Sequence, residues 1–163
     1  MTVAAYDPLR GLRVLLDHEV DFVVIGGVAA RLWGSPTVTN DLDVCAGWDA
    51  ANLERLAAAL VELRARLRRA PDDVTFLLDA QTLANGRNFT FSTDAGGLDV
   101  LGAPTGGFDY PTLRDAARPI ELGALTVMVV DLDDLIAMKR AAGRPKDRIE
   151  VEVLEAVRDE RQA

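Results

Sequence analysis

The pattern of apolar and polar positions predicts helices and strands that alternate along the chain. Apolar residues follow helical spacing in residues 7–20, where Asp7 is a candidate N-cap and Pro8 a first-turn residue. A continuous apolar run at residues 22–25 then predicts a short buried strand that stops at two glycines. A short helix over residues 28–34 follows, and Gly34 closes it.

The middle of the chain carries three further patterns. Residues 41–47 read as a second strand, and residues 48–70 as a long amphipathic helix with Asp49 as its N-cap. Residues 71–86 are ambiguous and indicate an extended piece followed by a polar loop. Residues 87–102 predict a β-hairpin that turns at residues 94–97.

The last third of the chain is expected to begin with a loop-rich segment, residues 103–123, that contains one helical turn. A strand at residues 124–131, a helix ended by Gly143 and a charged helix after Pro145 complete the order. This succession predicts a single α/β domain over residues 1–163, with a small mixed sheet flanked by helices.

Composition narrows the function classes. The 163 residues carry a formal net charge of -8, which gives no general attraction to nucleic acid or anionic membranes but leaves room for a local basic patch. Cys45 is the single cysteine, so no disulfide can form within the chain. No signal peptide or apolar run of membrane-spanning length is present in the sequence, and we expect a cytoplasmic protein.

Two aspartates in the second predicted strand are the first candidates for chemistry. Asp41 and Asp43 are two residues apart, so both carboxylates point to one face of the strand. Carboxylates this close repel each other unless a cation or a proton lies between them, and Mg²⁺ prefers such oxygen ligands. The alternative is that both residues belong to the solvated face of an ordinary strand.

Gly26 and Gly27 lie where the first strand leads into a helix. Glycines there allow the backbone to approach an anion closely, and the free N–H groups of the helix start favour a phosphate group. The alternative is a plain tight turn, because the further residues of a Walker loop or a dinucleotide fingerprint are missing.

Asp99 is a third candidate because it is the one carboxylate in an apolar strand of the predicted hairpin. A buried carboxylate is rare unless it is paired, ligates a metal or acts in catalysis. It could complete a metal site and accept a proton from an attacking hydroxyl, or it could meet solvent at a strand edge.

Together the glycine pair, the Asp-x-Asp pair and the later single Asp resemble the nucleotidyltransferases that share the fold of DNA polymerase beta. More narrowly, residues 21–154 resemble minimal bacterial nucleotidyltransferases and the AbiEii-type toxins of abortive infection; the segment 131–154 adds to this resemblance. The resemblance implies the polymerase beta-like fold and transfer of an NMP from an NTP such as ATP. It also implies two Mg²⁺ ions at Asp41, Asp43 and Asp99, and the triphosphate at Gly26 and Gly27.

Further residues are candidates for the nucleotide site. Many relatives have a basic residue where this chain has Thr37, so that phosphate contact is either missing or supplied from elsewhere, with Lys139, Arg144 and Lys146 as the candidates. Lys139 could instead be a surface lysine and Lys146 part of a helix cap. Ser35 is a candidate phosphate contact or a turn former.

The acceptor stays open between three hypotheses. The first is a toxin that modifies tRNA or another RNA and is silenced by an antitoxin protein. The arginines at the end of the long predicted helix either contact RNA or are solvated there: Arg64, Arg66, Arg68 and Arg69. The second is transfer to a small molecule or a protein. The third is an inert domain that binds nucleotide or a partner.

Overall fold

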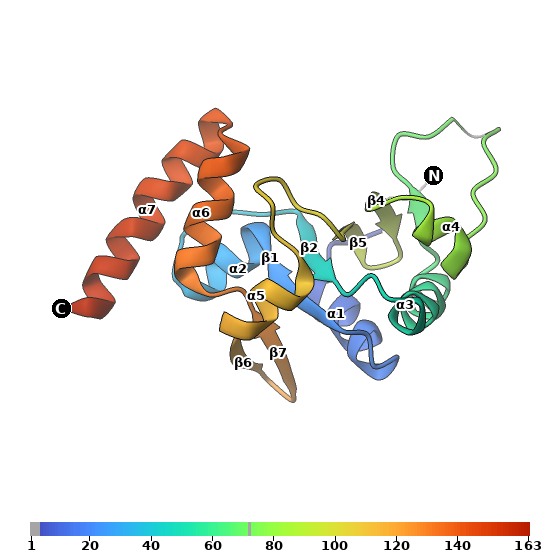
Figure 1. The fold of residues 1–163 in the computed structure, drawn as a ribbon, viewed down its shortest axis with the longest axis horizontal. Coiled ribbons are helices and arrows are strands. Elements are labelled where there is room, and N and C mark those ends of the chain that lie inside the picture. The colour runs from blue at the N-terminus through green and yellow to red at the C-terminus, as the bar shows by residue number, and fades with distance from the viewer. Residues whose placement is uncertain (1–3, 72) are drawn as a thin grey trace.

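The computed structural model describes residues 4–71 and 73–163, which form helices around one mixed sheet (Figure 1). The helices are α1 (Pro8–Asp17), α2 (Gly26–Trp33), α3 (Ala50–Glu62), α4 (Ala80–Ala84), α5 (Tyr110–Ala116), α6 (Leu132–Ala142) and α7 (Pro145–Gln162). The strands are β1 (Phe22–Ile25), β2 (Asp41–Ala46), β3 (Arg66–Leu67), β4 (Asn88–Thr93), β5 (Gly96–Leu101), β6 (Arg118–Leu122) and β7 (Leu125–Val129).

The seven strands lie in the order β3-β4-β5-β2-β1-β7-β6. β1 pairs antiparallel with β2 and parallel with β7, and β2 pairs parallel with β5. Both flanks are antiparallel hairpins, β4–β5 and β6–β7, with β3 added at one edge. The structure therefore confirms the predicted α/β class with a mixed sheet flanked by helices.

The centre of the sheet is the most deeply buried part of the fold. All four residues of β1 are buried, as expected of an apolar strand that is flanked on both sides. On β2 the alternation predicted from sequence holds: Leu42 and Val44 are buried, while Asp41 and Asp43 are half-buried on the other face. The core thus holds one side of β2 and leaves the other side for the two carboxylates.

The prediction of a long helix over residues 48–70 is wrong for its last third. Helix α3 begins after its N-cap Asp49 as predicted, but it ends at Glu62, and Arg64 has a left-handed backbone with φ of 54°. The chain then forms β3, in which Leu67 pairs with Phe91 of β4. Pairing with the sheet edge outweighs the helix propensity of this arginine-rich segment, because tertiary contacts override a weak local preference.

Three smaller boundaries differ from the expectation. Helix α2 begins at Gly26 rather than at residue 28. The polar stretch after Asp79 forms the short helix α4, because the Asp79 side chain caps Thr82. Residues 118–122, expected in a loop, form β6 against β7.

Helices α6 and α7 form a hairpin at one end of the molecule, and α3 and α4 lie at the opposite end (Figure 1). Gly143 ends α6 in a left-handed conformation with φ of 65°, as the sequence predicts. None of the helices in the described residues is both long and apolar enough to cross a membrane.

Candidate active site

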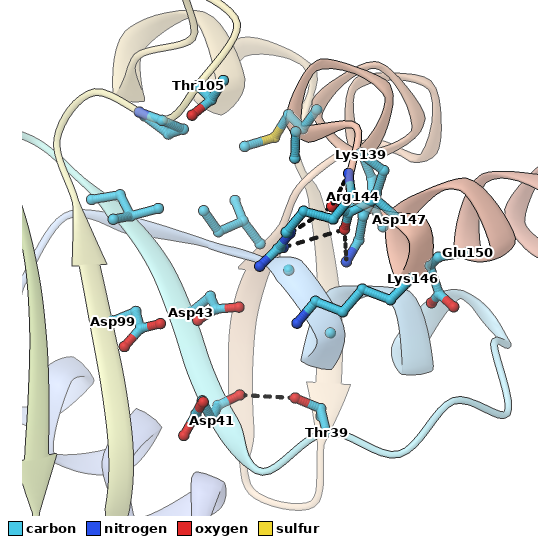
Figure 2. Close-up of a pocket in the computed structure, with 18 of the residues that line it drawn as sticks. Thr39, Asp41, Asp43, Asp99, Thr105, Lys139, Arg144, Lys146, Asp147 and Glu150 are labelled. Atoms are coloured by element: carbon cyan, nitrogen blue, oxygen red, sulfur yellow. Dashed lines mark hydrogen bonds and ion pairs between the residues drawn. The ribbon is translucent and has the colours of Figure 1, made fainter.

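A cavity of about 760 Å³ lies between the sheet and the α6–α7 hairpin (Figure 2). Its sheet side carries the three predicted carboxylates, and its helix side carries the candidate basic residues. The lining includes all but one of the residues that the sequence singled out for metal or nucleotide: Gly26, Gly27, Asp41, Asp43, Asp99, Lys139, Arg144 and Lys146.

The pairing of β2 with β5 brings the three carboxylates together. Asp43 lies opposite Asp99 in this parallel register, and Asp41 lies opposite Gly97. Because Asp41 and Asp43 share one face of β2, all three side chains reach the same side of the sheet (Figure 2). Asp99 is therefore a neighbour of the pair rather than an isolated edge residue.

Gly26 and Gly27 lie directly against this strand. Ile25 pairs with Asp43, so the next residue, Gly26, passes the Asp43 carboxylate, and a Cβ atom on Gly26 would collide with it. A Cβ on Gly27 would come within 2.7 Å of the Thr39 side chain. Gly26 also has a φ of 65°, which favours glycine. The close approach of this backbone to β2 therefore requires both residues to be small.

The carboxylates have shifted proton affinities. Burial and the neighbouring charge of Asp99 raise the pKa of Asp43 to about 7. Burial also raises the pKa of Asp99, although a hydrogen bond with Asp43 and the charge of Arg68 act in the opposite direction. Crowded, partly desolvated carboxylates of this kind favour either a shared proton or a bound cation.

The donor set fits a hard divalent cation. Asp99 Oδ1 is buried, and although Arg68 Nη2 lies 3.2 Å away, no donor among the described residues meets this oxygen with hydrogen-bond geometry. Carboxylate oxygens are the ligands that Mg²⁺ prefers. Within residues 4–71 and 73–163, however, no three acidic, His or Cys side chains converge closely enough to form a ready metal cage. A metal ion at this site would therefore require the carboxylates to move closer together.

Arg68 is a residue of this site that the sequence analysis placed elsewhere, at the end of a helix. Its Nη2 atom lies 3.2 Å from Asp99 Oδ1 and 3.6 Å from Asp41 Oδ1. The side chain reaches the cavity because β3 turns the arginine-rich segment onto the sheet edge. The alternation of charged and apolar residues in Arg66-Leu67-Arg68 is the one signal for a strand that could have indicated this placement.

The opposite wall of the cavity is basic. Lys139 extends from α6, whereas Arg144 and Lys146 extend from the start of α7 (Figure 2). The buried side chain of Asp147 lies between them, 3.8 Å from Lys139 Nζ and 2.6 Å from Arg144 Nε. Burial tends to raise the pKa of Asp147, but the hydrogen bonds and charge of Arg144, together with Lys139, lower it overall. The ionised carboxylate of Asp147 therefore holds the side chains of Lys139 and Arg144 at the cavity.

Ser35 and Thr37 belong to one small network at the edge of the cavity, which Thr37 helps to line. Ser35 is buried, and its hydroxyl donates to Thr37 Oγ1 over 3.1 Å and accepts from the Thr37 N–H over 3.2 Å. Thr37 in turn donates to the buried Glu150 over 2.6 Å. This placement favours the turn-forming role for Ser35 over a phosphate contact. Thr37, at the position where relatives often have a basic residue, thus donates a hydrogen bond to an acidic side chain.

Comparison with known proteins gives likeness at the level of the fold. No family model matches the chain, and no curated protein matches it. Among solved structures, TM1012 from Thermotoga maritima, described as a candidate nucleotidyltransferase, is 19% identical with a TM-score of 0.56, over 96% of this chain and 94% of that chain.

Two further solved structures are also similar. The lincosamide antibiotic adenylyltransferase LnuA, solved with lincomycin, is 12% identical with a TM-score of 0.61, over 92% of this chain and 95% of that chain. ANT(2")-Ia, solved with adenylyl-2"-tobramycin, is 16% identical with a TM-score of 0.56, over 96% and 97%. The chain therefore has the nucleotidyltransferase fold, which confirms the predicted fold, while the narrower resemblance to AbiEii-type toxins stays a prediction.

Proposed function

We propose that this chain is a Mg²⁺-dependent nucleotidyltransferase that moves an NMP from an NTP to an acceptor and releases pyrophosphate. One observation carries the proposal: three carboxylates and three basic residues face each other across a single cavity in a nucleotidyltransferase fold. A triphosphate with bound cations has the charge pattern that fits between two such walls.

The phosphates would lie between the glycine pair and the basic wall. Helix α2 begins at Gly26 without a side-chain cap, so its first N–H groups can donate to phosphate oxygens. Three basic residues face the same region: Lys139, Arg144 and Lys146. They would supply the phosphate contact that relatives make with a basic residue at the position of Thr37. These groups bind and orient the β- and γ-phosphates, and they stabilise the pyrophosphate as it leaves.

The carboxylates would hold the reacting centre. Asp41, Asp43 and Asp99 would bind two Mg²⁺ ions, which neutralise charge on the phosphates and on the attacking oxygen when bound. The acceptor oxygen forms a bond to the α-phosphorus while the bond from that phosphorus to the β-phosphate oxygen breaks. Asp99 accepts the proton of the acceptor hydroxyl. Positioning and charge neutralisation, rather than a protein nucleophile, supply the rate enhancement.

In-line displacement fixes the side from which the acceptor arrives. If pyrophosphate leaves toward the basic wall, the acceptor approaches from the opposite side, where Arg68, Arg69 and Thr90 line the cavity. Two arginines there favour an acceptor with negative charge. Arg64 and Arg66, which are close to Arg68 in the sequence, are exposed, and this cluster of arginines supports an RNA such as tRNA as the acceptor of a toxin.

A small-molecule acceptor is the second candidate. LnuA and ANT(2")-Ia, which share the fold, are named as an antibiotic adenylyltransferase and as a complex with an adenylylated antibiotic. Neither of these observations favours a protein acceptor, and neither favours a domain that binds nucleotide without turnover.

The test is transfer of label from each of the four α-labelled NTPs with Mg²⁺, with and without total RNA. Transfer that stops in both Asp41→Ala and Asp43→Ala supports the proposal, and the labelled product identifies the acceptor class. Arg140→Ala is the control, because Arg140 pairs with Glu155 of α7 and does not line the cavity. Transfer that persists in the Asp variants would overturn the roles given to the carboxylates. Growth arrest on expression, relieved by Asp43→Ala, would support the toxin.

A further inference from the structure

The Arg68 guanidinium occupies a fixed place beside the carboxylates. Its Nη2 atom donates to the Phe91 carbonyl over 2.8 Å and lies within ion-pair distance of both Asp99 and Asp41. The backbone is held as well, because the Arg68 N–H donates to the Thr90 carbonyl over 2.9 Å, next to the Leu67 pairing with β4. Only 24% of the side chain is exposed. This is a built contact rather than a surface arginine that samples many rotamers.

Strand β5 leaves room for this contact. A Cβ atom on Gly97 would collide with Asp41 Oδ1 and come within 2.6 Å of Arg68 Nη2. Gly97 is also the register partner of Asp41. The glycine therefore lets the carboxylate of Asp41 and the guanidinium of Arg68 meet over the strand, where any larger residue would separate them.

The positive charge of Arg68 lowers the electrostatic repulsion between the three carboxylates. It compensates Asp41 and Asp99, whereas Asp43 keeps no ion-pair partner among the described residues. A divalent ion that enters the same cluster meets a fixed charge of its own sign within a few ångströms, in a partly desolvated site where repulsion is strong. Arginine and metal therefore compete for the same oxygens.

We propose that Arg68 is the resident counter-ion of the carboxylate site, a positioning residue that aligns Asp41 and Asp99 before metal binds and must release them when a divalent cation enters. This inference rests on the metal site of the proposed function. Its consequence is a weak affinity for the metal alone. The negative charge of a bound NTP offsets the arginine, so that metal enters efficiently with nucleotide.

The test measures the binding of Mn²⁺ alone at pH 8 by titration calorimetry. It compares wild type with one variant that loses the charge of Arg68 and one that keeps it. Arg68→Gln keeps an amide donor for Phe91 but loses the charge, and Arg68→Lys keeps the charge. We expect Arg68→Gln to bind Mn²⁺ about tenfold more tightly, and Arg68→Lys to stay within about threefold of wild type. Arg66→Gln, two residues away in the sequence but outside the cavity lining, is the control and leaves the affinity unchanged within about twofold.

Equal or weaker Mn²⁺ binding by Arg68→Gln would overturn the counter-ion role. Circular dichroism checks the fold, and Arg68→Met, which also removes the charge, replaces Arg68→Gln if that variant does not fold. A second readout is the metal dependence of NMP transfer: Arg68→Gln should reach half-maximal transfer at a lower Mg²⁺ concentration than wild type, because no arginine competes with the ion for Asp41 and Asp99.

The two proposals fail separately. Tighter Mn²⁺ binding by Arg68→Gln without any NMP transfer in wild type keeps the counter-ion role and overturns the transferase. Asp41-dependent transfer with the same Mn²⁺ affinity in wild type and Arg68→Gln keeps the transferase and overturns the counter-ion role.

Discussion

The two walls of the cavity carry opposite charges and are stabilised in opposite ways. On the sheet, Asp41, Asp43 and Asp99 crowd together, and Asp99 Oδ1 has no hydrogen-bond donor among the described residues. On the helices, Lys139 and Arg144 share the buried carboxylate of Asp147. The basic wall thus contains its own counter-ion, whereas the acidic wall depends on Arg68, which comes from a distant part of the chain.

This difference teaches which wall lowers the stability of the fold. Clustered carboxylates that share too little positive charge destabilise a folded protein, and such strain is common at catalytic sites. A cation held by a buried aspartate does not add this cost. Substitutions in the acidic wall should therefore lower activity while they raise the stability of the metal-free protein. Substitutions in the basic wall should mainly weaken binding of the NTP.

The largest effect is expected for Asp43→Asn. Loss of a metal-binding carboxylate should reduce NMP transfer by about 10³-fold or more. The metal-free protein at pH 8 should nevertheless melt a few degrees higher, because the substitution removes a buried charge next to Asp99. Labelled-NTP transfer and thermal unfolding in chelator measure the two quantities. A lower melting temperature would contradict the strain assigned to the acidic wall.

Lys139→Ala changes the basic wall and should weaken binding of the NTP. We expect kcat/KM to fall about 10- to 100-fold, chiefly through KM, because a charge-assisted phosphate contact is lost. Arg140→Ala is the matched control: Arg140 is the next residue on α6, but it pairs with Glu155 and does not line the cavity. Steady-state kinetics distinguish the two, and equal losses in both variants would remove Lys139 from the phosphate site.

Gly26→Ala should lower both stability and activity. Gly26 has a φ of 65° and faces Asp43, whereas Gly123 has a φ of 62° and nothing within 4 Å of its Cβ position. Both substitutions should cost about 1 kcal/mol in backbone strain, but only Gly26→Ala displaces a carboxylate and should slow transfer about tenfold or more. Denaturant unfolding and kinetics on both variants test this, and a fully active Gly26→Ala would contradict the close packing of Gly26 on Asp43.

The metal-free protein should lose stability as pH rises. The folded state raises the pKa of Asp43 from its ordinary value of 3.8 to about 7, so it binds a proton that the unfolded chain has released. The free energy of unfolding therefore falls between about pH 4 and 7, by up to about 1.4 kcal/mol per pH unit for this group. Unfolding in chelator at pH 5.5 and 8 measures the slope, and Asp43→Asn should remove most of it. A slope that Asp43→Asn leaves unchanged would assign the effect to another group.

The smallest effect is expected for Thr37→Val. The variant loses the hydroxyl that donates to Glu150 over 2.6 Å, which should cost about 1 kcal/mol in stability. Transfer should change by less than about threefold, because Lys139 and its neighbours, rather than Thr37, face the phosphates in our proposal. Kinetics at saturating NTP give the answer, and a large loss of kcat would instead place Thr37 among the catalytic contacts.

The sequence predicted most of the secondary structure because most of these elements are defined locally. The N-caps Asp7 and Asp49 and the helix end at Gly143 were all confirmed. Besides the short helix α4, the missed elements are the strands β3 and β6, which both lie at edges of the sheet. Their pairing partners, rather than their own residues, decide that they are strands, so periodicity alone could not find them.

For the candidate site, the sequence by itself determined that Asp41 and Asp43 share a face, because alternation along a strand is a local property. It also indicated a close backbone approach at Gly26. Only the tertiary structure decided that Asp99 lies opposite Asp43 and that Arg68 joins them. Those placements depend on the register of β5 with β2 and of β3 with β4, which hydrogen bonds between distant segments fix.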